Sequence, residues 1–451
     1  MKCAFSGGMQ KARTANVGAV LIIVLWVAFG LVSMVLYFGH TMVMQFRASE
    51  QNSAGIEAEQ ATEGAIRYIS YMLTNSVLPG EIPPSDSHPS QGVMIGDAAF
   101  WLIGRSDRTD NQDIPTYGLV DECSKLNLNT ATRQMLEFLP GMTYQLAGAI
   151  IDWRDSDSEI TDNGAESEVY QRLTTPYLCK NAAFETVEEL HLVYGGNMDV
   201  LYGEDVNLNG VLDLNENDGL NSPPTYDNRD GRLDSGVLEY LTIYSREPDI
   251  GTNGSARISV NSIGQSQLSS LMQETFGQQR ANAIQAGIAG FQGNIKSLLE
   301  FYIRSGMSIQ EFEQIASEIT VTNATVPGLV NVNTASAAVL SCIPGIGTEN
   351  AEKLVNYRRG NQSTNSIAWV AQVLDQTNAI TAGPYLTTRS FQFSADIVAM
   401  GRLGKGFRRT FVVFDVSDGK PKVIFRRDRS RLGWALGSET RQPWLAGKEL
   451  R

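Results

Sequence analysis

The hydrophobic pattern begins with one long apolar run and continues as an amphipathic helix. Residues 17–38 carry no charge, and at about 1.5 Å per residue they can span the roughly 30 Å hydrocarbon core of a bilayer. From Thr41 to Leu73 there is no proline, and proline and glycine at residues 79–84 end the pattern. Apolar residues recur there at steps of three and four: Ala54, Ala58, Ala61, Ala65, Ile69 and Met72. We therefore expect one helix, half in lipid and half packed on a domain.

Short segments rich in strand-forming residues lie near both ends of the remaining chain. The expected strands are residues 98–103, 117–120, 390–400, 408–416 and 422–427. Residues 417–420 would join the last two strands as a hairpin. Because helical patterns fill the chain between the two groups of strands, we expect an α+β fold in which a helical domain is inserted into a sheet domain.

The chain repeats itself at an offset of 204 residues. Residues 127–142 contain NLNTA followed by LPGM, residues 331–347 contain NVNTA followed by IPGIG, and a partial copy starts at Ile258. The Asn-Thr or Thr-Ala positions are expected to supply the N-cap oxygen of a first helix, and Pro-Gly is expected to form a turn with a positive-φ position. Each copy is therefore predicted to be a helix-hairpin-helix unit, the core of a small helical domain that is similar to sterile-alpha-motif domains.

Helix-hairpin-helix turns often bind DNA phosphates, so a membrane-anchored DNA receptor of the competence type is the alternative function. The second copy has Lys353, Arg358 and Arg359 close to its turn, whereas the first copy leads into Asp155 and Asp157, which repel phosphate. The net charge of the whole chain is −13, although residues 401–451 hold thirteen basic and five acidic residues. Because phosphate neutralisation needs a basic surface, we expect no nucleic-acid binding and hairpins used for packing.

The start of the chain has the pattern of a prepilin-type signal. A basic leader without acids ends at Gly18, and the apolar run begins at once, so the expected cut lies between Gly18 and Ala19 and leaves the helix in place. The basic leader puts the N-terminus in the cytoplasm and the rest of the chain outside. Most such proteins carry Glu at mature position five, where this chain has Ile23. A generic signal anchor is the alternative.

Residues 125–196 carry a resemblance to a known family. They read KLNLNTATRQMLEFLPG, then AIIDWRDSDSEITDNGAES, then KNAAFETVEELHLVYGG. Together with the prepilin-type start that lacks the acid, the two helical repeats and the trailing strands, they resemble the minor pseudopilin K of type II secretion systems (GspK). The resemblance implies a large helical domain inserted into a small pilin-like sheet domain.

The resemblance also implies a function and a location. It implies a tip subunit of the pseudopilus that initiates or caps assembly and supports export of folded proteins across the outer membrane. The implied partners are the minor pseudopilins I and J, the major pseudopilin and other type II secretion components. The implied location is the bacterial inner membrane, crossed once, with the large C-terminal domain in the periplasm.

These expectations divide the chain into eight segments. They are a leader (1–18), the transmembrane and amphipathic helix (19–75), the first strands of the pilin-like domain (96–122), a first helical domain (123–198), an insertion (199–250), a second helical domain (251–384), the C-terminal strands (385–435) and a tail (436–451).

The insertion contains the twelve-residue register of an EF-hand loop. Oxygen-bearing side chains stand at positions 1, 3, 5, 9 and 12, and Gly210 stands at position 6, where the loop bends sharply. The expected ligands are Asp205, Asn207, Asn209, the backbone carbonyl of Val211, Asp213 directly or through water, and Glu216 with both oxygens. The sequence therefore predicts Ca²⁺ as a cofactor, and a polar surface loop is the alternative.

Two further acidic segments are candidate calcium sites. An imperfect register, with the unsuitable Tyr226 at position 1 and Asp227 beside it, would offer Asn228, Asp230 and Asp234. An acidic cluster beside the first helical hairpin comprises Asp155, Asp157, Asp162 and Glu166. The resemblance implies calcium in this helical domain, and a solvated acidic loop is the alternative.

The sequence contains no recognisable catalytic motif. His40, His88 and His191 stand in no triad or zinc motif, so we expect a structural component and not an enzyme, with no small-molecule substrate. A signal-anchored calcium-binding protein without a pilus is a third hypothesis. Cys123, Cys179 and Cys342 follow the apolar run and allow one disulfide at most, with buried thiols as the alternative.

Overall fold

The fold is described from a computed structural model. It describes residues 17–75, 78–84, 88–105, 114–222, 226–261, 265–289, 293–361, 366–437 and 439–441. Most of the expected leader therefore lies outside the described residues, and Gly18 and Ala19 lie near the start of the first helix.

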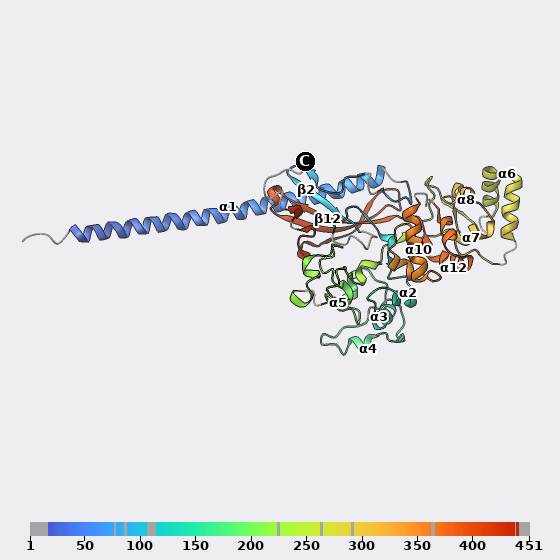
Figure 1. Ribbon diagram of the computed structural model, residues 1–451, viewed down its shortest axis with the longest axis horizontal. Coiled ribbons are helices and arrows are strands. Elements are labelled where there is room, and N and C mark those ends of the chain that lie inside the picture. Colours follow the sequence, from blue (N-terminus) through green and yellow to red (C-terminus); the bar gives the residue numbers. More distant parts are fainter. Residues whose placement is uncertain are drawn as a thin grey trace, which may run out of the picture.

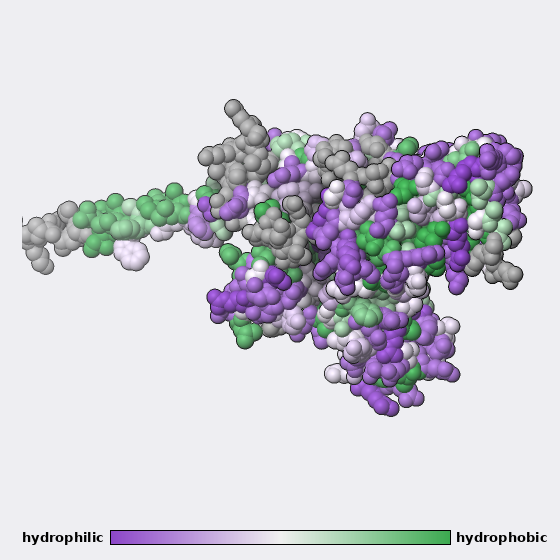
Figure 2. Space-filling view, turned by 45° about the vertical axis from the view of Figure 1, so that its right-hand side comes forward, coloured by the Kyte–Doolittle hydropathy of each residue, from purple (hydrophilic) through white to green (hydrophobic). Residues whose placement is uncertain are grey.

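A single long helix, α1 (Val17–Asn75), runs from the free N-terminal half into the body of the molecule (Figure 1). Its first half is apolar and exposed, and within the described residues it is the one helix long and apolar enough to cross a membrane (Figure 2). The expected stripe of the second half is buried, from Ala54 at 0% exposure to Met72 at 4%. The helix lies so close to the sheet domain that a Cβ on Gly401 would stand 2.2 Å from the carbonyl oxygen of Ala54. The prediction of one continuous helix whose second half packs on a domain is confirmed, and the prediction that its first half lies in lipid stays a prediction.

α1 packs on one face of a six-stranded sheet with the order β1-β2-β12-β13-β14, in which β3 also pairs with β12. The strands are β1 (Val93–Ile95), β2 (Ala98–Ile103), β3 (Val120–Asp121), β12 (Gln392–Met400), β13 (Phe407–Asp415) and β14 (Lys422–Asp428). β12 is central and runs antiparallel to both β2 and β13, with Phe100 opposite Ala399. Phe100, Ile397 and Phe414 share a buried core with α1.

Four of the five expected strands are present within one or two residues of their predicted bounds. The prediction of a strand at 117–120 is wrong in part, because Tyr117 makes a single bridge to Ile103 and the strand is β3. β1 was missed, since its three residues are too short for an alternating pattern to stand out.

The insertion between β3 and β12 begins with the first helical repeat. Its elements are η1 (Glu122–Ser124), β4 (Leu126–Asn127), α2 (Arg133–Glu137), α3 (Tyr144–Arg154), α4 (Ser167–Tyr170), η2 (Val187–His191) and α5 (Met198–Tyr202). A segment of short elements follows: η3 (Leu214–Glu216), η4 (Gly219–Asn221), η5 (Val237–Tyr240), β5 (Leu241–Thr242) and β6 (Arg246–Glu247).

The second half of the insertion contains the partial copy and the second repeat. The elements up to the second hairpin are β7 (Ile258–Ser259), α6 (Gln265–Ala289), α7 (Leu298–Ser305), α8 (Ile309–Ile315), β8 (Ile319–Thr320), β9 (Val326–Pro327), β10 (Val330–Asn331), α9 (Ala337–Ser341) and α10 (Gly347–Gly360). The insertion closes with η7 (Ile367–Trp369), α11 (Val370–Val373), α12 (Gln376–Ala382), η8 (Gly383–Tyr385) and β11 (Leu386–Thr387). Two further turns, η9 (Arg402–Gly404) and η10 (Ser430–Leu432), flank the C-terminal strands.

Three parallel two-residue pairs, β4 with β5, β7 with β8 and β10 with β11, open the two repeats and the partial copy between them. The buried residues of all three units form one continuous core, which includes Leu136, Ile284 and Leu340. The helical insertion therefore packs as one body and not as independent hairpins.

The two hairpins are built alike, but their caps differ from the prediction. Gly141 and Gly345 have φ values of 71° and 84°, as expected for the Pro-Gly turns. The first helices are capped by Thr132 and Ser336, and not by the Asn-Thr or Thr-Ala positions. The side chain of Asn127 instead accepts a hydrogen bond from the amide of Asn129, and the second copy repeats this contact 204 residues later.

Both repeats contain the same contact between an arginine and two backbone carbonyls. Arg154 donates to the carbonyls of Leu128 and Ala131, and Arg358 donates to the carbonyls of Val332 and Ala335. The guanidinium of Arg358, which the alternative DNA receptor would need for phosphate, is thus engaged by the backbone of its own hairpin.

Cys123, Cys179 and Cys342 are buried free thiols, and no disulfide joins them. Burial raises the pKa of the Cys179 thiol to about 11, so it stays protonated near neutral pH.

Candidate metal centres

The loop of residues 205–216 has the internal hydrogen bonds of an EF-hand loop. The carboxylate of Asp205 accepts from the amides of Asn209 and Gly210, both at 2.9 Å. The side chain of Asn209 accepts from the amide of Val211, and that of Glu216 accepts from the amide of Asp213 at 3.0 Å. Gly210 has a φ of 69°, as position 6 requires. These bonds turn the side chains at positions 1, 5 and 12 inward.

Two oxygen atoms of this loop are buried and receive no hydrogen bond. They are Oδ1 of Asn207 and Oε1 of Glu216. Glu216 is 1% exposed, and burial raises its pKa to about 8. Burial also raises the pKa of Asp205, although Arg105 opposes the shift. Buried oxygens without donors, and a Glu216 carboxyl whose pKa is raised by burial, fit a divalent cation that is bound by oxygen ligands.

The acidic cluster beside the first hairpin is the second centre. One carboxylate oxygen each from Asp155, Asp157 and Glu166 lie within 4.8 Å of one another. Oδ1 of Asp155 and Oε1 of Glu166 are buried without a donor, and burial raises the pKa of both carboxyls. Asp152 and Asn181 each add one more buried oxygen of the same kind. This concentration of acceptors again fits a hard cation.

The structure changes the predicted membership of this cluster. Asp162 is not among the three grouped carboxylates, since its side chain is 83% exposed and pairs with Arg133 at 3.5 Å. Asp152 and Asn181, which act on Glu166 from beside the three grouped carboxylates, were not named as candidates. Asp152 stands one helical turn before Asp155, a spacing that could have revealed it. Asn181 has a φ of 48° and belongs to a distant stretch of the chain, so nothing in the local sequence marks it.

In the second, imperfect register, hydrogen bonds within the loop and to Glu204 already engage the side chains that would bind an ion. The two oxygens of this buried carboxylate accept from the amides of Asn228 and Asp234, at 3.0 and 2.9 Å. Asn228 donates to Asp234 at 2.8 Å, and its side chain accepts from the amide of Asp230. Among the described residues no buried oxygen of this loop lacks a donor. The geometry therefore gives this register less reason to bind an ion than the other two sites.

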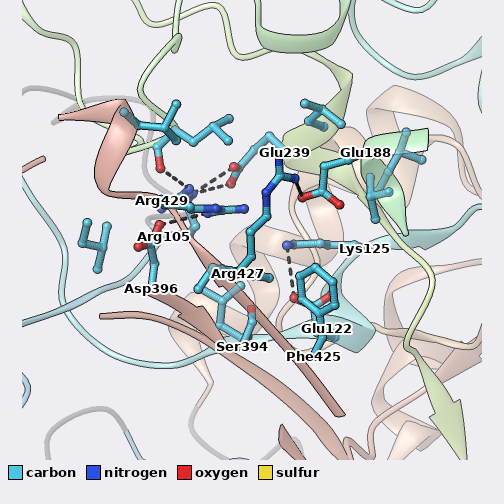
Figure 3. A pocket seen from close by; sticks show the side chains of 18 of the residues that line it. Arg105, Glu122, Lys125, Glu188, Glu239, Ser394, Asp396, Phe425, Arg427 and Arg429 are labelled. Atoms are coloured by element: carbon cyan, nitrogen blue, oxygen red, sulfur yellow. Dashed lines mark hydrogen bonds and ion pairs between the residues drawn. The ribbon is translucent and has the colours of Figure 1, made fainter. Parts of the chain in front are cut away.

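The loop of residues 205–216 contributes Leu208 to the wall of a cavity of about 290 Å³. Charged side chains line this cavity (Figure 3). Arg105 pairs with Glu239 at 2.8 Å, and Arg429 pairs with Asp396 at 2.9 Å. Arg427 of β14 pairs with Glu188, which links the sheet to the first helical repeat. The cavity walls therefore join the sheet to the inserted segment through paired charges.

Two family models match parts of the chain. Residues 124–201 match the first domain of the family "Type II secretion system (T2SS), protein K", and residues 328–374 match the helix-hairpin-helix motif. The resemblance predicted from residues 125–196 is confirmed by the first match, and the hairpin of the second repeat is confirmed by the other.

Two known proteins are similar to the chain. The type II secretion system protein K of Pectobacterium carotovorum subsp. carotovorum is 38% identical over 56 residues, which cover 12% of this chain and 17% of that protein. The chain thus aligns with less than a fifth of the length of this relative. A solved structure of the GspK-GspI-GspJ complex from enterotoxigenic Escherichia coli aligns over 85% of this chain and 99% of the solved chain, with 11% identity and a TM-score of 0.38.

Proposed function

Since residues 124–201 are a type II secretion system protein K domain, we propose that the chain is a minor pseudopilin of a type II secretion system. The observation that carries the proposal is the combination of this domain with a long exposed apolar helix that continues into a sheet domain. Such a chain is anchored in the inner membrane by α1 and carries its body in the periplasm. Its partners are the minor pseudopilins I and J, the major pseudopilin and other components of the secretion system.

The proposed place of the subunit is the tip of the pseudopilus. Cleavage after Gly18 makes Ala19 the new N-terminus, and mature position five is then Ile23. A subunit without an acid at this position lacks the charge that neutralises the free amine of a neighbouring subunit. The large insertion between β3 and β12 adds bulk that a growing fibre would have to pass. Both features favour a subunit that initiates or caps assembly and supports export of folded proteins.

Calcium has a structural role in this proposal. One ion is bound by the loop of residues 205–216, and a second is bound by Asp155, Asp157, Glu166, Asp152 and Asn181. In both centres the ion would supply positive charge to carboxylates whose charged form burial disfavours, and it would thereby fix segments that contain few helices or strands.

Deletion of the gene tests the proposed function. Export of the proteins that the type II system of the host secretes should fall to the background of a secretion-defective strain, and the wild-type gene should restore it. A variant with Gly18→Val should not restore export, because the leader remains uncut, whereas Gly30→Val in the middle of the apolar run should. Normal export in the deletion strain would refute the proposal.

The helix-hairpin-helix match favours DNA binding as a second candidate function. Against it, the guanidinium of Arg358 already donates hydrogen bonds to backbone carbonyls, and Lys353 pairs with Glu349 at 2.7 Å. An electrophoretic mobility shift at moderate salt decides between the two. A shift that is weakened by Gly345→Val and Lys353→Ala would favour the receptor, and no shift at micromolar protein excludes it.

A further inference from the structure

We propose that Arg105 and Arg409 are positioning residues for the calcium loop, which they fasten to the sheet by holding the carbonyls of Asn207 and Leu208. The proposal rests on the calcium centre proposed above for residues 205–216. It assigns that centre a further task, namely to control how firmly the helical insertion is joined to the pilin-like sheet.

The contacts are made to the backbone between two ligand positions. Arg409 donates to the carbonyl of Asn207 at 2.6 Å and to that of Leu208 at 2.8 Å. Arg105 donates to the same Leu208 carbonyl at 2.9 Å. Neither arginine offers an oxygen to a cation, so both act on the loop from outside.

The arginines contact the loop at a residue with an uncommon backbone conformation. Leu208 has a φ of 55°, a left-handed conformation that is uncommon for a leucine. It separates position 3, Asn207, from position 5, Asn209, and its backbone sets the direction of both side chains. Asn209 is also tied outward, through a hydrogen bond of 3.1 Å from Nδ2 to the carbonyl of Ala435. The arginines therefore hold the backbone between Asn207 and Asn209, whose side-chain oxygens would be ligands of the ion.

The arginines themselves are fixed by the sheet. Arg409 of β13 is fully buried and pairs with Asp396 of β12 at 2.7 Å. Arg429 pairs with the same carboxylate (Figure 3). Arg105 follows β2 and is held by Glu239 of η5, which belongs to the insertion (Figure 3). Hydrogen bonds from charged groups thus connect the centre of the sheet to the loop of residues 205–216 and to η5, both of which belong to the insertion.

Binding and positioning are linked in both directions. If the arginines favour the loop shape that binds calcium, then bound calcium must favour the contact between loop and sheet by the same free energy. Removal of calcium should therefore loosen the joint between insertion and sheet, and not the loop alone.

The direction in which calcium affinity changes when an arginine is removed distinguishes a positioning role from simple charge repulsion. Removing a positive charge beside a cation site strengthens calcium binding if charge alone matters, because repulsion falls. Removing a positioning residue weakens binding, because the loop is no longer held. Hydrogen bonds from charged groups have net free energies that correspond to about a tenfold change in affinity or more.

Calcium titration of the detergent-solubilised full chain tests the proposal by calorimetry. The binding step that disappears in Asp205→Asn belongs to the loop, and Arg105→Met and Arg409→Met should weaken that step by about tenfold. Arg427→Met is the matched control, because it removes a cation of the same cavity that contacts no loop carbonyl in the described structure, and it should not weaken the step.

Two results overturn the proposal in different ways. Unchanged or tighter binding in the Arg105 and Arg409 variants rejects the positioning role and leaves the calcium centre standing. Absence of any loop step in the parent chain rejects the calcium centre itself, and neither result bears on the export assay. If Arg409→Met does not fold, as judged by circular dichroism, Arg105→Met decides, since its side chain is 21% exposed.

Discussion

Glu166 and Glu216 are 3% and 1% exposed, and each keeps one carboxylate oxygen without a hydrogen-bond donor. Asp162 lies only four residues from Glu166, yet its side chain is in solvent. The acidic sequence around both positions predicts several candidates, but burial separates them. At the residue scale, the candidate ligand oxygens are those that the fold buries without a hydrogen-bond donor. The residue type alone does not reveal this.

The two proposed centres predict the effect of single substitutions on calcium stoichiometry. The full chain should bind about two ions, and Glu166→Gln or Glu216→Gln should each remove one, because a neutral amide lacks the charge and the second oxygen of a bidentate ligand. Isothermal titration calorimetry measures the number of ions. Asp162→Asn is the control and should bind as the parent does, so equal loss in this variant would contradict the assignment of ligands.

Asp121 predicts a pH dependence that is independent of calcium. Its carboxylate accepts from Ser390 and Thr334 at 2.6 Å, at the junction of β3 with the insertion, and burial raises its pKa to about 6. Because the folded pKa is above the usual value, this group stabilises the fold fully below about pH 4 and loses that contribution as the pH rises through about 6. The contribution is at most about 3 kcal/mol.

The melting temperature of the calcium-saturated chain, measured between pH 5 and pH 7.5, checks this prediction. The parent should melt at lower temperature at pH 7.5, and Asp121→Asn, which keeps the shape but carries no charge, should reduce this difference. An identical pH dependence in parent and variant would rule out Asp121 as its source.

At the scale of elements, the repeats show how far a sequence pattern predicts local structure. The offset of 204 residues correctly predicts two equivalent hairpins and their positive-φ glycines. It fails for the caps, because the side chains of Asn127 and Asn331 turn back to their own backbone and leave capping to Thr132 and Ser336. Thr, Ser and Asn are all good caps, so propensity alone cannot choose between positions a few residues apart.

The arginine contact of the hairpins is an element-scale prediction. Arg358→Met leaves the carbonyls of Val332 and Ala335 without their donor and should destabilise the insertion by about 2–3 kcal/mol. The expected drop in melting temperature is about 5 °C or more. The exposed Arg359→Met serves as the control and should change it little. A drop of the same size in both variants would show that the contact with the carbonyls is not the cause.

At the scale of the whole molecule, α1 joins two environments. Its stripe of Ala54, Ala58, Ala61 and Ala65 is fully buried against the sheet, while its apolar N-terminal half is exposed. The periodicity and length of this helix and the strands at both ends of the domain could be predicted from sequence, because they depend on local patterns. The shared core of the three inserted units and the arginine contacts to the loop of residues 205–216 could not, since they depend on residues more than two hundred positions apart.

The most direct test of the account is the mass of the mature N-terminal peptide of the chain recovered from the inner membrane. The account predicts a chain that begins at Ala19 and stays in the membrane fraction through its apolar helix. A chain that keeps residues 1–18, or one that is recovered in the soluble periplasmic fraction without residues 19–38, would contradict it.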